Sequence, residues 1–428
     1  MPSVTLSTRP RVLTLSLRAI LAAGVLATTL IGCGESGSSN AGPDFGSPTV
    51  TPNEFNESAL LANLADNVVT PTYTQFVGLS EQLATDINTY CSSEIALDGQ
   101  TGTADDVTAA LGTAQNSWRA SMNQWQQIEL MQFAPLINED GILRDRIYSW
   151  PVVSSCGVDL DIVSFEVGNI NGAPFEIALR TPARKGLDAL EYLLFNSNLD
   201  HSCVGTTFPE GWNGRTDPSR KIARCQFAAE VATDINANAD ILLSEWSGTN
   251  GFASVLKTAG SVGNQFETEH QAVNHISDAM FYIDSITKDG KLATPLGLFA
   301  NVCGAEPCPE AVESPYANNS LNNILNNLLS LQKLYSGDLG SNNQGVGFDD
   351  FLNDVGDNDT AQAMTTAINE AIASINAYQG TLANTLADSP DQVEASHQDV
   401  KDITDIMKSD YINSLALELP ATSAGDND

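Results

Sequence analysis

The sequence has very little positive charge. Only 19 of its 428 residues are lysine or arginine, against 53 aspartate and glutamate residues, and the formal net charge is −34 at pH 7. A surface of this sign repels the phosphates of nucleic acids and anionic lipid headgroups, so we expect no nucleic-acid partner. We interpret most of these carboxylates as a solvated acidic coat, which would also suit a saline environment.

Long apolar runs are equally scarce, because the sequence contains one such run and it is short. Residues 19–31 follow three arginines and have the length of a signal-peptide core rather than of a membrane span. The run ends in Leu30-Ile31-Gly32-Cys33, which resembles a bacterial lipobox. We therefore predict a lipoprotein signal peptide over residues 1–32 and lipidation of Cys33. The alternative is an ordinary signal peptide with a chance cysteine.

The residues after the predicted cleavage point indicate where the protein is anchored. Residues 33–54 are rich in glycine, serine, asparagine and proline, a composition typical of a flexible tether. In a Gram-negative host, Gly34 in place of aspartate indicates sorting to the outer membrane. We predict a protein anchored to that membrane by lipid alone and facing the periplasm. Loss of the three signal arginines would take the net charge from −34 to −37.

Several catalytic signatures are absent from the sequence. It has no Gly-x-Ser-x-Gly elbow, phosphate loop, dinucleotide fingerprint or His-Glu-x-x-His motif. Six cysteines remain after Cys33, and an even number in an exported protein predicts three disulfides. The segment 303–308 could be half of a zinc site, but no second cysteine pair or histidine cluster accompanies it. Proximity along the chain favours the pairs Cys303–Cys308, Cys203–Cys225 and Cys91–Cys156.

Apolar residues recur at helical spacing through most of the chain, and alternating strand patterns are nearly absent. The best strand candidate is Ile162–Val167. Residues 134–181 mix proline, glycine and short segments, which predicts a long irregular connection. A Gly- and Asn-containing break at 247–251 marks a candidate boundary. We therefore predict an all-α fold of two helical-bundle domains, residues 55–247 and 252–420, with the irregular connection in the N-terminal half.

One predicted helix carries two acids with unusual placement. Thr181 is a good N-cap and Pro182 suits the first helical position, so a helix is expected to begin there. Asp188 and Glu191 are three residues apart and lie side by side on that helix, where like charges repel unless a cation or proton lies between them. Gly186 costs about 1 kcal/mol relative to alanine, which suggests a close approach by another group. The alternative is that Arg184 pairs with Asp188 and that Glu191 is solvated.

This segment resembles the hallmark of the imelysin family, Gly-x-His-x-x-Glu followed by an apolar run. The match consists of Gly186, Asp188 and Glu191. Further segments that are similar to the family follow its order along the chain: Trp118–Pro135, Trp150-Pro151, Lys291–Gly297, Glu313–Tyr316 and Leu415–Pro420. The resemblance implies two helical-bundle domains with a site at their interface, export, and a link to iron uptake. The family takes its name from a surface metallopeptidase.

The sequence departs from the family pattern at the residue that matters most for metal chemistry. Asp188 stands where the family has histidine, so the pair with Glu191 offers only hard oxygen ligands. Oxygen ligands suit ferric iron or calcium better than catalytic zinc. We therefore expect a metal ion, with iron preferred, and the replacement weakens the peptidase interpretation more than the iron-binding one.

Three further acids and one histidine are candidates beside this pair. Glu129 continues an apolar stripe, so it needs a buried partner, and the resemblance agrees in placing it at the site as a metal ligand. Glu269 has a similar position and is left open. Glu267 and His270 have the spacing of a di-iron motif, but a single copy favours a structural histidine.

These observations lead to three hypotheses. The preferred one is a lipid-anchored protein that binds a metal or a metal-loaded ligand for iron uptake and works with iron-transport components. The alternatives are a metallopeptidase with a variant site and a non-catalytic interaction protein. The metal ligands would be Asp188, Glu191 and Glu129, and the interface site would include Gly186, Trp118, Trp150, Glu313, Ser314 and Tyr316.

Overall fold

The computed structural model describes residues 55–338, 345–420 and Ser423, and it confirms the all-α prediction. The predicted signal peptide, the lipidated Cys33 and the tether lie outside the described residues. The one sheet within the described part is a two-residue hairpin, in which β1 (Asn169–Ile170) pairs antiparallel with β2 (Ala173–Pro174). Within the same residues, no helix combines the length and apolar character needed to cross a bilayer.

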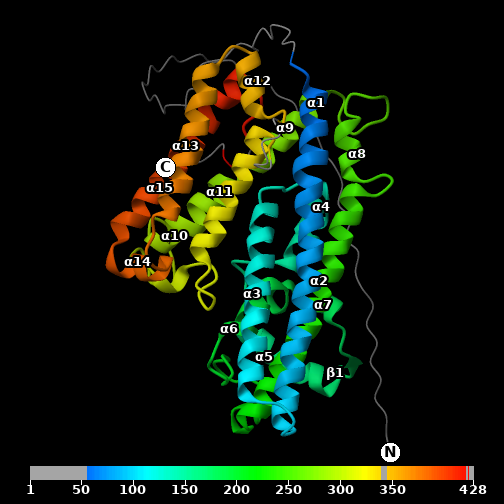
Figure 1. Ribbon diagram of the computed structural model, residues 1–428. Helices are drawn as coiled ribbons and strands as arrows, with labels where there is room; N and C mark the ends of the chain where they lie inside the picture. The colour runs from blue at the N-terminus through cyan, green and yellow to red at the C-terminus, as the bar shows by residue number, and fades with distance from the viewer. Residues whose placement is uncertain (1–54, 339–344, 421–422, 424–428) are drawn as a thin grey trace, which may run out of the picture. The chain divides into compact units, whose positions relative to one another are not determined.

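Three long helices form the body of the N-terminal half. α2 (Thr70–Asp98) packs along both α3 (Ala104–Ile128) and α7 (Asp217–Ser247), and Figure 1 shows the three side by side. Thr103 and Asp106 form a capping box that fixes the start of α3. The short α1 (Glu57–Asn63) and the π-helix η1 (Leu64–Val69) precede α2. Aromatic side chains of α2 and α3 are fully buried between the helices, as the predicted apolar stripes require.

The segment predicted to be a long irregular connection is more ordered than expected. It contains α4 (Ala134–Ile147) and α5 (Ser155–Val167), so the prediction of an irregular 134–181 was wrong in part. The strand prediction for Ile162–Val167 was also wrong, because this stretch is the second half of α5. The Ser154 hydroxyl caps α5 at its start, and Gly168 in the left-handed region ends it. Single-turn 3₁₀ helices follow at Ile177–Leu179 and Pro182–Arg184, before α6 (Gly186–Phe195) and a further one at Trp212–Gly214.

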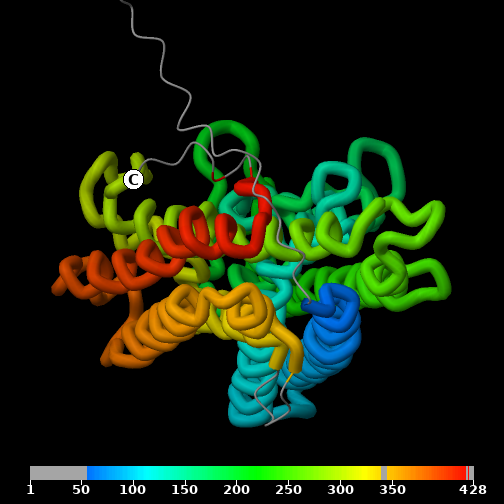
Figure 2. The backbone as a smooth tube through the Cα atoms, turned by 90° about the horizontal axis from the view of Figure 1, so that it is seen from above, coloured from blue at the N-terminus to red at the C-terminus, as the bar shows by residue number. Residues whose placement is uncertain are grey.

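The C-terminal half is a set of shorter helices. α13 packs against both α11 and α15, and Figure 2 shows α13 and α15 side by side. α15 also lies against the π-helix η5. α11 packs on α3 and α9 on α1, so the two halves of the chain are in direct contact. The elements are α8 (Phe252–Lys257), α9 (Glu269–Met280), η5 (Ile283–Ala293), α10 (Thr294–Leu296), η6 (Pro309–Ala311), α11 (Ser320–Ser336), α12 (Phe348–Asp354), α13 (Asn358–Asn376), α14 (Leu382–Asp388), α15 (Pro390–Ile406), η7 (Met407–Tyr411) and α16 (Ile412–Ser414).

The link between the halves coincides with the predicted boundary. Gly248 to Gly251 connects the end of α7 to the start of α8. The division into two domains at this point stays a prediction.

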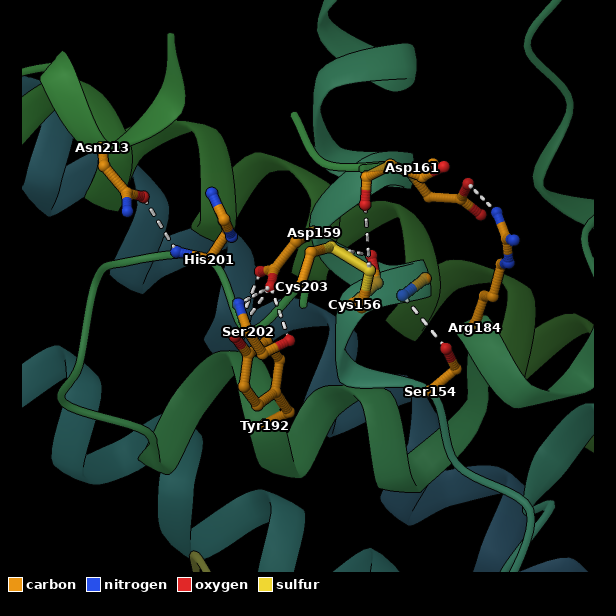
Figure 3. The surroundings of a disulfide bond; sticks show 12 residues. Ser154, Cys156, Asp159, Asp161, Arg184, Tyr192, His201, Ser202, Cys203 and Asn213 are labelled. Atoms are coloured by element: carbon orange, nitrogen blue, oxygen red, sulfur yellow. Dashed lines mark hydrogen bonds and ion pairs between the residues drawn. A yellow bond between two sulfur atoms is a disulfide. The ribbon is translucent and has the colours of Figure 1, made fainter. Parts of the chain in front are cut away.

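Three disulfides are present, but two of the predicted pairs were wrong. Cys303 pairs with Cys308 as expected, whereas the other bonds are Cys91–Cys225 and Cys156–Cys203. Cys91 and Cys225 lie on α2 and α7, whose lengthwise packing brings them together across 134 residues. Figure 3 shows the second bond, which ties the first turn of α5 to the loop after α6. Proximity in sequence failed because helix packing decides which cysteines meet.

Candidate functional site

The helix that carries the two acids begins later than its sequence suggests. Pro182–Arg184 form a separate 3₁₀ turn, and the α-helix begins at Gly186. Gly186 has a φ of +85°, and a Cβ there would lie 2.8 Å from the carbonyl oxygen of Ile147. The predicted close approach is therefore made by backbone from the end of α4. Only glycine adopts this conformation without strain and leaves room for that carbonyl.

Buried polar contacts hold α6 in place from both sides. The Trp118 indole N–H on α3 donates to the Leu187 carbonyl at 2.8 Å. The Lys185 ammonium is fully buried and lies 2.8 Å from Asp234 on α7. The Tyr192 hydroxyl donates to Asp159 on α5, which also accepts hydrogen bonds from the Ser202 backbone and hydroxyl (Figure 3). α6 is thus fixed by three neighbouring elements before any ligand binds.

Asp188 and Glu191 are both buried, each with 5% of its surface exposed. Asp188 accepts hydrogen bonds from the Ser149 hydroxyl at 2.8 Å and from the Ser149 backbone at 3.4 Å. Glu191 accepts one from the Ala317 backbone N–H at 2.8 Å. The alternative in which Arg184 pairs with Asp188 and Glu191 is solvated was wrong, since Arg184 instead lies 3.1 Å from Asp161. Backbone and hydroxyl donors, not a basic side chain, hold the two carboxylates.

The environment of the two acids favours their protonated forms. Burial raises the pKa of Asp188 to about 7, against the lowering effect of its hydrogen bonds from Ser149. Burial also raises the pKa of Glu191 to about 8, and the negative charges of Asp188 and Glu313 add to the rise. Near neutral pH the pair therefore holds protons that a cation could replace.

The two acids line one cavity of about 420 Å³ between the two halves of the chain. One wall comes from residues 148–155 and α6, and the other from residues 290–316. Four aromatic side chains line it, Tyr148, Trp150, Tyr192 and Tyr316, together with a third acid, Glu310. The lining residues include three acids and no lysine, arginine or histidine. The predicted interface residues Trp150, Ser314 and Tyr316 are therefore brought together with Asp188 and Glu191.

Behind this cavity lies a buried polar network centred on Lys291. Its ammonium group is fully buried and lies 2.7 Å from Glu129 and 3.2 Å from Glu313. It also donates to the side-chain oxygens of Gln126 and Asn327. The network joins α3, η5, α11 and the segment before α11 at one point.

The network reaches the cavity through one tyrosine and one tryptophan. The Tyr148 hydroxyl donates to Glu313 at 2.6 Å, while its side chain lines the cavity. The Lys291 ammonium lies 5.8 Å from the centre of the Trp150 ring, a cation–π distance. Sequence reasoning missed Tyr148 and Ser149 as site residues; their position directly before Trp150-Pro151 was the available signal.

Comparison with known proteins places the chain in a family. The sequence profile described as Imelysin matches residues 69–408. The chain belongs to the imelysin family. Iron-regulated protein A of Synechococcus elongatus is 24% identical to it over 284 residues, a match that spans 65% of this chain and 64% of that protein. The match thus covers less than two thirds of the relative's length.

Two solved structures share the fold of this chain. An iron-regulated protein A precursor from Parabacteroides distasonis superposes with a TM-score of 0.62 at 20% identity, covering 84% of this chain and 94% of that one. An imelysin-like protein from Psychrobacter arcticum superposes with a TM-score of 0.61 at 16% identity, covering 85% and 96%. At these identities the likeness establishes the fold alone.

The remaining predicted site residues lie away from the cavity wall. Glu129 pairs with Lys291, and burial raises its pKa while the ammonium group lowers it. Its assignment as a metal ligand stays a prediction, and the geometry gives its carboxylate another partner. Trp118 lies in the core, and Glu313 lies in the Lys291 network. Neither side chain lines the cavity, but Trp118 donates a hydrogen bond to the backbone of α6 and Glu313 accepts one from Tyr148.

The other candidates have structural surroundings. Glu269 is exposed at the first position of α9. The His270 ring contacts Glu57 at 2.7 Å and the Ala416 carbonyl at 3.0 Å, which ties α9 to α1 and to the end of the chain. Cys303 and Cys308 form a disulfide, so they offer no thiolate to zinc.

The donor set at the cavity limits what it can bind. Among the residues that the structure describes, no three histidine, cysteine, aspartate or glutamate side chains come together to hold a metal ion. Asp188 and Glu191 supply two adjacent carboxylates with no basic partner, which fits a hard cation bound in part by other ligands. Two carboxylates leave most of the coordination sphere of such a cation to water or to its other ligands.

Proposed function

We propose that this member of the imelysin family is an exported, lipid-anchored protein that binds iron for uptake, as an ion or in a small iron-bearing ligand, at the cavity lined by Asp188 and Glu191. The observation that carries the proposal is the burial of two adjacent acids on one cavity wall with no base to neutralise them. Two buried like charges are costly unless protons or a cation lie between them. The name of the Synechococcus relative, iron-regulated protein A, supports iron as the cation.

The replacement of the family's histidine by Asp188 fits cargo binding better than peptide hydrolysis. Catalytic zinc sites use three protein ligands, commonly with nitrogen or sulfur among them, and leave one position for water. Two carboxylates alone form an incomplete hard-oxygen site, from which an ion can be released. Reversible binding is what an uptake protein requires.

The cellular location is part of the proposal. Lipidation of Cys33 would hold the protein at the outer membrane on the periplasmic side, where iron-transport components are its expected partners. Mass spectrometry of the N-terminal peptide tests this: we expect a lipid-modified Cys33 as the first residue, and Cys33→Ser should release the protein from the membrane fraction. An unmodified mature N-terminus would contradict the anchor without affecting the iron site.

The decisive test is metal binding by isosteric variants. We expect the purified mature protein to bind about one iron atom, supplied as anaerobic ferrous iron or from a weak ferric chelator. The double variant Asp188→Asn, Glu191→Gln keeps shape but removes both charges, and its affinity should fall by about 100-fold, or roughly 2.7 kcal/mol. Elemental analysis after gel filtration and calorimetric titration measure the two quantities.

A matched control lies on the surface of α15. Asp402 and Asp405 have the same three-residue spacing, but both are exposed. The double variant Asp402→Asn, Asp405→Asn removes the same charge and should leave iron binding unchanged. Equal loss in both double variants would mean that the acidic coat, rather than the cavity, attracts iron, and the proposal would fail.

A further inference from the structure

The sign of the cavity's charge restricts what it can accept. Its wall carries Asp188, Glu191 and Glu310, and no basic side chain lines it. The buried ammonium group of Lys291, behind the cavity, is already held between Glu129 and Glu313. An anionic ligand would enter without a counter-charge, at a high desolvation cost. The ligand that fits is therefore neutral or cationic.

The size of the cavity exceeds what a single ion needs. A water molecule occupies about 30 Å³ in the liquid. An ion with its first hydration shell would therefore leave much of a cavity of about 420 Å³ unfilled, and the cavity also has room for a small organic molecule. Volumes of this order are typical of small-molecule sites. The wall supplies two buried carboxylates, which leaves most of an octahedral coordination sphere to come from elsewhere.

The outer part of the cavity carries exposed apolar side chains beside Glu310, and an aqueous ion does not require them. Val302 lines the cavity with 80% of its surface exposed, and Val153 and Tyr316 line it with 39% and 41% exposed. Val152, next to Val153, is 68% exposed. Exposed apolar side chains gathered at the opening of a cavity mark a binding surface for an apolar group. The buried acids Asp188 and Glu191 lie inside, whereas Val302, Val153, Tyr316 and the third acid, Glu310, are more exposed to solvent.

We propose that the cargo of this site is an iron chelate of net positive charge, with an apolar body and two open coordination positions. This inference rests on the proposed function and names its substrate class. A ferric ion held by two monoanionic bidentate groups, such as hydroxamates, carries one positive charge and binds two waters. Asp188 and Glu191 release their protons to solvent, the two waters leave the iron, and the carboxylate oxygens take the positions of the waters. The organic body then lies against Val302, Val153 and Tyr316.

The test compares three iron sources on the mature protein. They are the 1:1 ferric complex of a linear dihydroxamate, ferric citrate, which is anionic, and anaerobic ferrous iron. Quenching of tryptophan fluorescence reports binding beside Trp150. The hydroxamate-to-iron absorption band should shift when carboxylates replace the two waters. We expect the dihydroxamate complex to bind at least 10-fold more tightly than either other source.

Two variants separate this inference from the proposed function. Val302→Ser should weaken binding of the dihydroxamate complex several-fold and leave ferrous iron unaffected, while Val262→Ser, at a fully exposed site on another loop, should change neither. The chelate inference is overturned if ferrous iron or ferric citrate binds as tightly as the dihydroxamate complex, or if Val302→Ser has no effect. In either case, iron binding that depends on Asp188 and Glu191 would still support the proposed function. If none of the three sources binds, the proposed function itself fails.

Discussion

Lys291 and Glu313 form an ion pair with 3.2 Å between Nζ and Oε2, and both side chains are almost completely excluded from solvent. Glu129 shares the same ammonium group at 2.7 Å. One ammonium group thus lies between two buried carboxyl groups that come from the two halves of the chain. The network keeps Glu313 in position to accept the Tyr148 hydroxyl hydrogen at the cavity wall.

Removal of this cation should be strongly destabilising. Lys291→Met leaves the charges of Glu129 and Glu313 buried and unpaired, which typically costs about 3–5 kcal/mol. Urea denaturation with the disulfides intact measures the loss. Lys401→Met is the matched control, because Lys401 pairs with Asp405 on the surface of α15 and such a pair contributes at most about 1 kcal/mol. Equal losses in the two variants would mean that the buried network contributes no more than a surface pair.

The buried acids of the cavity should make stability fall as pH rises. The pKa of Asp188 is raised to about 7 in the folded protein, whereas an unfolded aspartate titrates near 4, so the folded state holds the proton more tightly. Below about pH 4 the Asp188 carboxyl is protonated in both states and does not change the free energy of unfolding. As pH rises from there toward the pKa of the folded state, the protein loses stability. Asp188→Asn should therefore stabilise the iron-free protein at pH 8, by up to about 4 kcal/mol, and have little effect at pH 4.

Denaturation midpoints at the two pH values test this expectation. Glu191→Gln should behave in the same way, with its window extending to about pH 8, where burial places its pKa. Asp98→Asn, at the exposed end of α2, is the control and should show no gain that depends on pH. A stability gain for Asp188→Asn that is the same at pH 4 and pH 8 would contradict the assignment of a buried, proton-holding carboxyl.

Local sequence patterns predicted the helices well, because each depends on neighbouring residues. Trp118 and Trp125, which recur at helical spacing, are buried as that spacing predicts. The capping box at Thr103 that starts their helix is a finding of the structure and was not predicted. The predicted strand at 162–167 failed because its apolar residues also fit the buried face of a helix that Ser154 caps. A short apolar run cannot distinguish the two by periodicity alone.

The contacts that build the site were beyond the reach of local patterns. The sequence required a partner for Glu129, but the partner is Lys291, 162 residues away. It also suggested a close approach at Gly186, but could not name the Ile147 carbonyl, which arrives from another helix. The spacing of Asp188 and Glu191 placed them on one helix face, and only helix packing determined that this face is buried.

Gly186 should tolerate no side chain. Its φ is +85°, and an added Cβ would lie 2.8 Å from the Ile147 carbonyl oxygen, so Gly186→Ala must shift the start of α6. We expect a loss of about 1–3 kcal/mol in unfolding free energy together with weaker iron binding, since Asp188 lies two residues on.

Gly112→Ala in the interior of α3 is the control, and its expected effect on stability has the opposite sign. No atom lies within 4 Å of its added Cβ, so it should gain up to about 1 kcal/mol and leave binding unchanged. A neutral Gly186→Ala would show that the backbone here is not constrained.

The disulfides should contribute to stability in the order of the chain segments they close. Cys91–Cys225 spans 134 residues and Cys303–Cys308 spans 5. In the chain-entropy account, the Cys91–Cys225 bond lowers the entropy of the unfolded state and thereby stabilises the folded protein by about 5 kcal/mol. The Cys303–Cys308 bond stabilises it in the same way by about 2 kcal/mol. Replacing each pair with alanines and comparing urea midpoints measures the difference, and peptide mapping without reduction checks the pairing itself.

Cys303 of the short bond directly follows Val302, so loss of this bond should mainly weaken binding of the iron chelate. Loss of Cys91–Cys225 should mainly lower the free energy of unfolding. The opposite pattern would mean that the 303–308 loop contributes to the fold rather than to the opening of the cavity.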